Sequence, residues 1–398
     1  MSGPLEGIRV LDLTAYLLGP FGTQILGDLG AEVIKGEPPE GDIMRRLGPS
    51  RHDGMGAVFL NLNRNKRSIV LDLKREAGRE ALLRLAAGAD VFIHNMRPKA
   101  IAALDLGYAA VSAANPKIVY CGTYGYRHDG PYGDKPAFDD MIQGASGMAA
   151  LVGRQSGEPG YVPTAFIDKT VGMAAAYAIL AALFHRERSG EGQELEVPML
   201  ETMVQFIMVE HLYGLTFEPP LGGAGYPRML APQRRPYRTR DGHICILPYT
   251  DRQWRRFLEL AGRPEVLEDP RFASFGARSE NIAELYELIG EVVPERTTAQ
   301  WLERLDEAQI PAMAVTDPDD LPDDPHLKAT GFFEIVEHPS EGALRNMAFP
   351  IRLSRSPGEL RRLAPRLGEH GREVLGEAGF GEAEIAALIA AGVTVEGG

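Results

Sequence analysis

Cysteine is scarce in this sequence, with only Cys121 and Cys245 among its 398 residues. Two cysteines are too few for the disulfide framework that stabilises many small secreted proteins. Neither cysteine has the neighbouring cysteines or histidines that a zinc site requires. We therefore expect no bound metal, and the low cysteine content favours a cytoplasmic location.

The sequence also lacks an excess of positive charge and a long apolar run. Its formal net charge of -13 at pH 7 argues against an extended nucleic-acid surface. The best membrane candidate, residues 171–184, is shorter than the ~20 residues needed to cross a bilayer and favours a core helix instead. No basic stretch followed by an apolar run opens the sequence. We therefore expect no signal peptide and neither a nucleic-acid nor a membrane partner.

Several common catalytic motifs are missing as well. The chain has no Gly-x-Ser-x-Gly nucleophile elbow and no P-loop lysine motif, and its histidines are scattered. Gly19 and Gly22 lack the full Gly-x-Gly-x-x-Gly fingerprint of dinucleotide-binding proteins, and Pro20 suits an early helical position. We therefore disfavour a nicotinamide site and expect no tightly bound cofactor.

What is present indicates an ordinary globular protein, 44% hydrophobic and 24% charged, and long enough for two domains. In the first half, apolar β-rich runs alternate with amphipathic segments. This alternation predicts a doubly wound, mainly parallel α/β sheet with ligand loops at the carboxyl ends of its strands. We expect strands at residues 8–13, 32–34, 69–73, 91–93, 118–121 and 193–197, and helices at residues 21–29 and 75–86 and from residue 200 onward.

A change in composition marks a second, smaller α+β domain, which we assign to residues 216–330. Proline and glycine at residues 217–226 indicate a domain crossing, and residues 237–247 predict a β-hairpin with an Asp-Gly turn. The acidic, proline-rich segment 316–325 is typical of a linker built from Pro-Asp turns. The expected helices of this domain lie at residues 251–260, 282–292 and 298–308.

Asp168 is the most informative residue, because it stands at the head of an almost wholly apolar helix. Burial of an ionised carboxylate is costly unless the group is paired or hydrogen-bonded. Judged from its neighbours alone, Asp168 is best explained as a helix cap, which typically contributes ~1 kcal/mol. A reactive carboxylate is the alternative interpretation.

The segment after Asp168, residues 173–193, closely resembles the stretch that follows the nucleophilic aspartate of class III CoA-transferases. This family includes formyl-CoA transferases and carnitine-pathway CoA-transferases. The resemblance spans nearly the whole chain, and its motifs are specific only when taken together. The other motifs are Leu5-Glu-Gly-Ile-Arg-Val-Leu-Asp-Leu-Thr14, Gly19-Pro20, Leu26-Gly-Asp-Leu-Gly-Ala-Glu-Val-Ile-Lys35, Asn65-Lys-Arg-Ser-Ile-Val-Leu-Asp-Leu-Lys74, Asn95-Met-Arg-Pro98, Leu106-Gly-Tyr108 and Leu367-Gly-Glu-His370.

This resemblance implies an acyl-CoA:carboxylate CoA-transferase, whose substrates are an acyl-CoA thioester and a free carboxylic acid. It implies that Asp168 attacks the donor acyl-CoA and passes through an aspartyl mixed anhydride and an aspartyl-CoA thioester. It further implies an interlocked homodimer. In that architecture, residues 331–398 return to the large α/β CoA-binding domain that residues 1–215 begin.

The resemblance also implies a set of CoA contacts. The cations of Lys74 and Arg97 would contact phosphates, whereas Leu71 and Met96 would cover the adenine or pantetheine. Ordinary solvated side chains are the alternative interpretation for the two cations. The full set of expected CoA contacts is Tyr16, Leu17, Leu71, Lys74, Asn95, Met96 and Arg97.

Two further groups are expected near the reacting carboxylate. Asp139 matches an acidic position of the family, and a helix-start cap is its alternative interpretation. Gly222, Gly223 and Gly225 are candidates for the flexible loop that shields intermediates in the family, but the segment departs from that loop because it contains Ala224 and no surrounding sequence fixes its placement. A domain linker is an equally good interpretation of these glycines, because glycine permits motion without proving it.

Two alternative functions stay open at this point. The 2-methylacyl-CoA racemases resemble this chain at Asp168 but use an upstream histidine, where residues 136–140 contain none and His128 is out of register. Without that histidine, two-base proton transfer loses one partner. A non-catalytic CoA-binding protein is the second alternative, which the presence of Asp168 disfavours.

Overall fold

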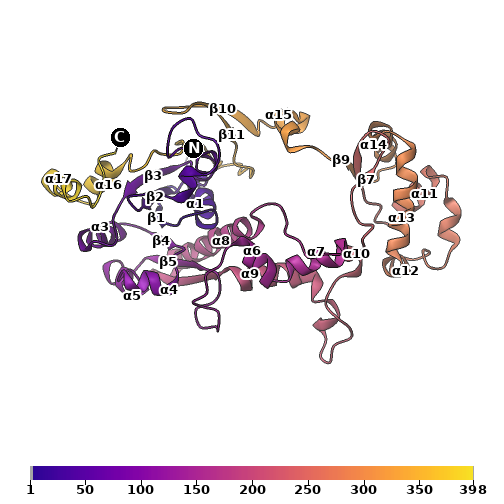
Figure 1. The fold of residues 1–398 in the computed structure, drawn as a ribbon, viewed down its shortest axis with the longest axis horizontal. Helices are drawn as coiled ribbons and strands as arrows, with labels where there is room; N and C mark the ends of the chain where they lie inside the picture. The colour runs from indigo at the N-terminus through magenta and orange to yellow at the C-terminus, as the bar shows by residue number, and fades with distance from the viewer. Residues whose placement is uncertain (1–2, 398) are drawn as a thin grey trace. The chain divides into compact units, whose positions relative to one another are not determined.

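The protein folds into two compact units in a computed structural model that describes residues 3–397 (Figure 1). Unit 1 comprises the chain up to Ser146, then Val162–Phe206, and the chain from Pro325 onward. Unit 2 comprises Gly147–Tyr161 and Ile207–Asp324. These boundaries differ from the expected starts at residues 216 and 331. Unit 2 also takes in Gly147–Tyr161, which the sequence-based boundaries placed in the large domain.

A sheet of six parallel strands forms the centre of unit 1. The strands are β1 (Arg9–Leu13), β2 (Glu32–Glu37), β3 (Lys66–Val70), β4 (Val91–His94), β5 (Val119–Tyr124) and β6 (Gln193–Pro198). They lie in the order β3-β2-β1-β4-β5-β6, and every neighbouring pair is parallel. This confirms the expected parallel α/β sheet. The strand order reverses between β1 and β4, and the crevice at such a switch point is where ligands bind.

The helices of unit 1 come from distant parts of the chain. They are α1 (Leu18–Asp28), α2 (Ala57–Leu62), α3 (Glu76–Ala86), α4 (Pro98–Ala103), α5 (Tyr108–Ala114), α6 (Asp139–Ala145), α8 (Phe166–Ser189), α9 (Met199–His211), α15 (Pro325–Ala329), α16 (Gly371–Glu377) and α17 (Glu382–Ala390). One hydrophobic cluster joins Phe92 and Tyr120 of the sheet to Leu82 of α3, Leu375 of α16 and Ile385 of α17. The C-terminal helices therefore pack within unit 1.

The third strand begins earlier than expected, at Lys66 rather than at residue 69. Its first residues, Lys66 and Arg67, are charged, which is atypical of a buried strand. Lys66 is nevertheless fully buried, because its ammonium donates to Asp12 Oδ2 at 3.2 Å and to Thr23 Oγ1 at 2.8 Å. A sequence pattern cannot reveal such distant partners.

Helix α8 is longer than the expected core helix at residues 171–184. Within the described part of the chain, it is the one helix whose length and composition would suffice to cross a membrane. Half of its most apolar window is buried inside the protein. The buried side includes Val171, Ala175 and Ile179, whereas Tyr177 and Phe184 are exposed.

Unit 1 also contains a β-hairpin and a 3₁₀ helix, and a second 3₁₀ helix lies in the segment that leads along the chain from unit 2 back to unit 1. The antiparallel strands β10 (Phe333–His338) and β11 (Gly342–Met347) form a two-stranded sheet that the sequence pattern did not predict. A 3₁₀ helix at Ile43–Arg46 follows β2. Another at Pro318–Asp323 occupies the expected acidic linker.

Unit 2 has its own core around Trp254, Phe257 and Trp301. Its three-stranded antiparallel sheet consists of β7 (Tyr237–Arg238), β8 (His243–Ile246) and β9 (Ala312–Ala314). The expected hairpin is therefore present as β7 and β8. The helices are α7 (Met148–Ser156), α10 (Pro227–Leu230), α11 (Asp251–Leu260), α12 (Phe275–Glu280), α13 (Ile282–Val292) and α14 (Thr298–Glu307).

Helices α1 and α8 approach each other closely at Gly22 and Gly172. A Cβ atom on Gly22 would lie 2.7 Å from the carbonyl oxygen of Gly172. A Cβ atom on Gly172 would lie 2.5 Å from the carbonyl oxygen of Leu18. Both contacts are with backbone, so glycine alone permits this packing. The contact matters because Asp168 lies one turn before Gly172 on α8.

We predict that Gly22→Ala lowers the free energy of unfolding by about 1–3 kcal/mol, because the added methyl group overpacks a backbone contact. Denaturant titration of the full chain measures this loss. Gly376→Ala is the matched control, since Gly376 lies in α16 with nothing within 4 Å of an added Cβ. The control should be neutral or slightly stabilising. Equal stability of Gly22→Ala and the parent would contradict the close packing.

Candidate functional site

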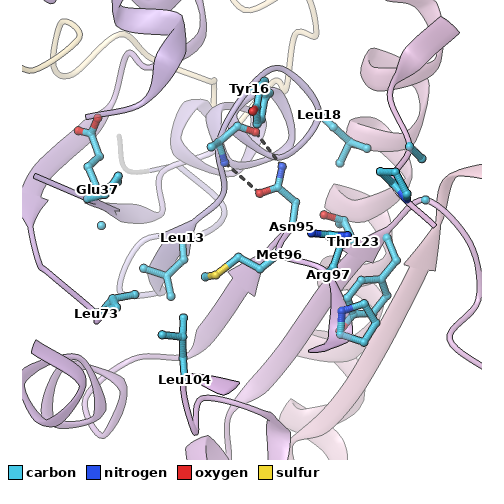
Figure 2. A pocket seen from close by; sticks show the side chains of 18 of the residues that line it. Leu13, Tyr16, Leu18, Glu37, Leu73, Asn95, Met96, Arg97, Leu104 and Thr123 are labelled. Carbon is cyan, nitrogen blue, oxygen red and sulfur yellow. Dashed lines mark hydrogen bonds between the residues drawn. The ribbon is translucent and has the colours of Figure 1, made fainter. Parts of the chain in front are cut away.

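A pocket of about 590 Å³ opens at the carboxyl ends of strands β1 to β5 (Figure 2). Its walls come from the segments that follow these strands, which meet at the switch point between β1 and β4. Asp168 of α8 also lines this pocket. The lining residues are Leu13, Ala15, Tyr16 and Leu18, residues 36–40, 71–74, 95–98 and 123–125, and Leu104, Gly133, residues 135–138 and Met199.

The pocket has an apolar side and a basic rim. Leu13, Leu73, Met96 and Leu104 lie together on one side (Figure 2). The cations that line the pocket are those of Lys74, Arg97 and Lys135, and no ion pair involves any of them within residues 3–397. An apolar surface with nearby unpaired cations suits a ligand that joins an organic body to phosphate groups.

Asp168 is not a helix cap. It is the third residue of α8, whose N-cap position is Ala165, and no side chain caps this helix end. The capping interpretation from the sequence was therefore wrong. Its carboxylate instead lines the pocket as a partly buried group.

Asp139 supports the helix turn that carries Asp168. Its Oδ2 accepts a hydrogen bond from the backbone N–H of Asp168 at 3.0 Å. Its Oδ1 accepts from Nε2 of the buried Gln143 at 2.6 Å, and Gln143 Oε1 accepts from Val162 N at 2.9 Å. Asp139 thus provides a hydrogen-bond acceptor at the start of α8, where the first N–H groups have no acceptor within the helix. It is the first residue of α6 and does not cap its own helix.

Two causes raise the pKa of Asp168. Burial disfavours the ionised form, and the negative charge of Asp139 adds to this effect, so that the pKa rises to about 6. The backbone N–H of residue 168 donates to Asp139 and not to the carboxylate of Asp168. At pH 7 the carboxylate is still largely ionised, although poorly solvated.

The pocket brings together most of the residues that the sequence suggested as CoA contacts. Tyr16, Leu71, Lys74, Asn95, Met96 and Arg97 line it with Asp168. Leu17 does not line it, and its expected contact with CoA stays a prediction. Its side chain packs against the separate cluster of Met44, Phe59 and Ala364, because successive residues at a helix start point to different sides.

The expected glycine loop lies in unit 2. Gly225 N donates to His211 O at 2.8 Å, and Arg154 Nη1 donates to Ala224 O at 2.7 Å. These bonds hold the loop within its own unit. Whether the loop shields an intermediate stays a prediction.

Sequence reasoning missed several pocket residues. Thr123 and Tyr124 end β5 and Gly125 follows it, and the rule that ligands bind at the ends of parallel strands could have identified them. Lys135 and Phe138 come from an irregular segment, for which the sequence carries no comparable signal.

Comparison with known proteins identifies the family of this site. The sequence profile of CoA-transferase family III matches residues 5–371, nearly the whole chain. The chain belongs to CoA-transferase family III. It is therefore a CoA-transferase enzyme, for which CoA thioesters are substrates, as the sequence motifs predict.

Relatives with named activities align over most of this family III chain. It is 33% identical to the succinate–glutarate CoA-transferase of Agrobacterium fabrum, over 94% of this chain and 95% of that protein. It is also 33% identical to the formyl-CoA:oxalate CoA-transferase of Streptomyces avermitilis, over 99% of this chain and 100% of that protein. The crystal structure of a CAIB/BAIF family protein from Brucella suis matches with a TM-score of 0.80 and 33% identity. That match covers 95% of this chain and 100% of the other.

We predict that Asp139→Asn moves the acidic limb of the pH–rate profile to lower pH. If the ionised form of Asp168 is the nucleophile, as proposed below, kcat/KM should rise with pH through about 6 in the parent. Removal of the Asp139 charge lowers the pKa of Asp168, and we expect the limb to move by roughly 0.5–1 pH unit. The burial effect stays, so the shift is partial. Steady-state exchange rates between pH 4.5 and 8 measure it.

The control for this experiment is Asp140→Asn. Asp140 is an exposed neighbour on the same helix turn, and its charge is not among the causes that raise the pKa of Asp168. Its profile should match that of the parent. An unshifted acidic limb in Asp139→Asn would show that the Asp139 charge does not act on Asp168.

Proposed function

We propose that the protein is an acyl-CoA:carboxylate CoA-transferase in which Asp168 carries the reaction covalently. The observation that carries this proposal is the position of Asp168 in the pocket with the cations of Lys74 and Arg97, which form no ion pair among the residues that the structure describes. One cavity thus offers a nucleophile together with groups that suit the phosphates of CoA.

The proposed reaction begins at the thioester carbonyl of the donor. An Asp168 carboxylate oxygen attacks this carbon, the C–S bond breaks, and a mixed anhydride and CoA thiolate form. The thiolate then attacks the aspartyl carbonyl, which releases the donor acid as carboxylate and leaves an aspartyl-CoA thioester. No net proton transfer is required, because each step exchanges one anionic leaving group for another.

The second half of the cycle repeats these steps in reverse with the acceptor. The acceptor carboxylate attacks the aspartyl carbonyl, and CoA thiolate leaves as a second mixed anhydride forms. The thiolate attacks the acceptor acyl carbonyl, which yields the new acyl-CoA and regenerates the Asp168 carboxylate. Activation of the acyl group is retained throughout, because it passes from thioester to anhydride and back to thioester.

The state of Asp168 suits this role. Burial and the Asp139 charge raise the pKa of Asp168 to about 6, so the group is still ionised at neutral pH. A poorly solvated carboxylate is a better nucleophile than one that water surrounds, since less hydration must be lost when it attacks. The bond from Asp168 N to Asp139 fixes the helix turn that carries it.

Among the residues that the structure describes, no histidine lines this pocket, so the racemase alternative lacks its histidine base there. The segment where the sequence reasoning sought that histidine, residues 136–140, carries Phe138, which lines the cavity. His128 does not line it, and its Nδ1 lies 2.7 Å from Glu196 Oε2 on the protein surface. Two-base proton transfer would require a second titratable group opposite Asp168. These observations favour the transferase.

We predict that Asp168→Asn abolishes exchange while the protein stays folded. The amide nearly preserves the size of the side chain but cannot act as a carboxylate nucleophile, so the rate should fall roughly a thousandfold or more. The assay mixes acyl-CoAs with labelled free acids, including the succinate, glutarate, formate and oxalate that the named relatives suggest as a starting panel. Mass spectrometry detects the label in the acyl-CoA product.

Trapping provides an independent test of the covalent step. Hydroxylamine added with acyl-CoA should convert Asp168 to a hydroxamate in the parent and in the Asp140→Asn control. Asp168→Asn should remain unmodified. If Asp168→Asn retains near-parent turnover, and mass spectrometry excludes its deamidation to Asp, the covalent mechanism is wrong.

We also propose that the protein works as an interlocked homodimer, as the family resemblance implies. Met173, Tyr177 and Phe184 recur on one face of α8 and are 48%, 63% and 65% exposed. Phe206 of α9 is 52% exposed, and its ring lies 5.8 Å from that of Phe166 at the start of α8. An apolar surface of this kind is typical of a subunit interface.

We predict that Tyr177→Glu weakens this dimer, because it places a charge in an apolar interface. Size-exclusion chromatography with light scattering should show a parent of twice the chain mass and a variant shifted toward the monomer. Ala109→Glu, at an exposed position of α5, is the control and should behave like the parent. A parent that is monomeric and fully active at low concentration would contradict the proposal.

A further inference from the structure

The turn between β1 and α1 is strained where it lines the pocket. Tyr16 has φ of 68°, in the left-handed region that residues other than glycine rarely adopt. Its ring lines the pocket and is 41% exposed. Such a conformation persists only when surrounding groups hold it.

One of the groups that holds the turn is the side-chain amide of Asn95. Its Oδ1 accepts from Ala15 N at 3.0 Å, and its Nδ2 donates to Ala15 O at 2.7 Å (Figure 2). Asn95 follows β4, the neighbour of β1 at the switch point of the sheet. The amide therefore binds both polar backbone groups of the residue before Tyr16, and does so across the crevice.

A buried ion pair holds the same turn from the other side. Asp42 Oδ1 accepts from Tyr16 N at 3.3 Å, and Asp42 Oδ2 lies 2.9 Å from Lys35 Nζ. Lys35 Nζ also donates to Thr14 O at 2.9 Å. Lys35 is fully buried and Asp42 nearly so. The turn is thus bonded at three successive residues.

The outcome of this bonding is the position of one aromatic ring. The Tyr16 ring meets the ring of Phe138 edge-on, with 5.5 Å between centroids and an angle of 71°. Phe138 immediately precedes Asp139, which bonds Asp168 N. The two rings therefore form one wall of the pocket, and this wall adjoins Asp139, the residue that holds the start of the Asp168 helix.

We propose that Asn95 is a positioning residue that acts on the CoA thioester through Tyr16, rather than as a direct CoA contact. This inference rests on the proposed function of the pocket. Asn95 keeps one further N–H and one lone pair, so a direct contact is the competing interpretation. The two interpretations differ in whether the effect of Asn95 depends on the Tyr16 ring.

A double-mutant cycle distinguishes them, with the dissociation constant of the full-length protein for CoA as the measured quantity. We expect Tyr16→Ala to weaken binding roughly tenfold through loss of the aromatic wall. We expect Asn95→Ala to weaken it roughly fivefold through release of the turn. If Asn95 acts through Tyr16, the double variant binds within about twofold of Tyr16→Ala alone.

Independent effects would overturn the proposal, because the two losses would then multiply. The proposal is also wrong if Asn95→Ala alone leaves affinity unchanged, or if Tyr16→Ala does so. Thermal denaturation of each variant checks that it is folded at the temperature of the assay. General destabilisation would not produce the specific non-additivity that we expect.

A crystal structure of Asn95→Ala tests the positioning role of Asn95 without relying on CoA binding. We expect the Tyr16 backbone to leave the left-handed region, or its ring to move away from Phe138. An unchanged turn in this variant would overturn the positioning role, whatever the pocket binds. A parent that does not bind CoA, together with a displaced turn in the variant, would instead reject the proposed function and retain the positioning role.

Discussion

The buried charges beneath the pocket are the constraint on which the architecture of unit 1 depends. Lys35 and Lys66 are fully buried within parallel strands, so each must have charged and hydrogen-bonding partners. Asp12 of β1 accepts from Lys66 of β3, and Asp42 accepts from Lys35 of β2. Burial acts to raise the pKa of Asp12, but Lys66 and Lys35 hold it below its ordinary value. Loss of any one partner would leave an uncompensated charge in the interior.

This network explains why the pocket has a fixed shape at the ends of its strands. Asp12 Oδ1 accepts from Thr14 N at 2.9 Å, and Lys35 binds the carbonyl of the same residue. The buried side chains of Asp12 and Lys35 therefore fix the backbone direction at Thr14, where the chain leaves the first strand. Close packing of Gly22 on Gly172 then joins the following helix to α8. The turn at Tyr16 and the carboxylate of Asp168, which line the same pocket, are consequently joined through closely packed helices.

The sequence predicted the features that local patterns determine. Apolar β-rich runs located β1, β4 and β5, and helical patterns gave the observed bounds of α11 and α13. The start of β3 could not be predicted, because Lys66 is accommodated by partners far away in sequence. The packing of Leu17 against Met44, Phe59 and Ala364 could not be predicted, since a family motif does not specify which way a neighbouring side chain points. The role of Asp139 depends on a hydrogen bond across 29 residues, which no local pattern contains.

The same two effects that raise the pKa of Asp168 also favour its proposed covalent intermediates. Since the folded pKa lies above the unfolded value, ionisation of Asp168 lowers the stability of the fold as pH rises through about 6. The aspartyl anhydride and the aspartyl-CoA thioester carry no charge on this carboxyl group. Their formation therefore removes both the burial penalty and the repulsion from Asp139. In the proposed mechanism, the unfavourable free energy of the ionised Asp168 carboxylate therefore favours acyl transfer. A second carboxylate beside Asp168, rather than a cation, suits this role.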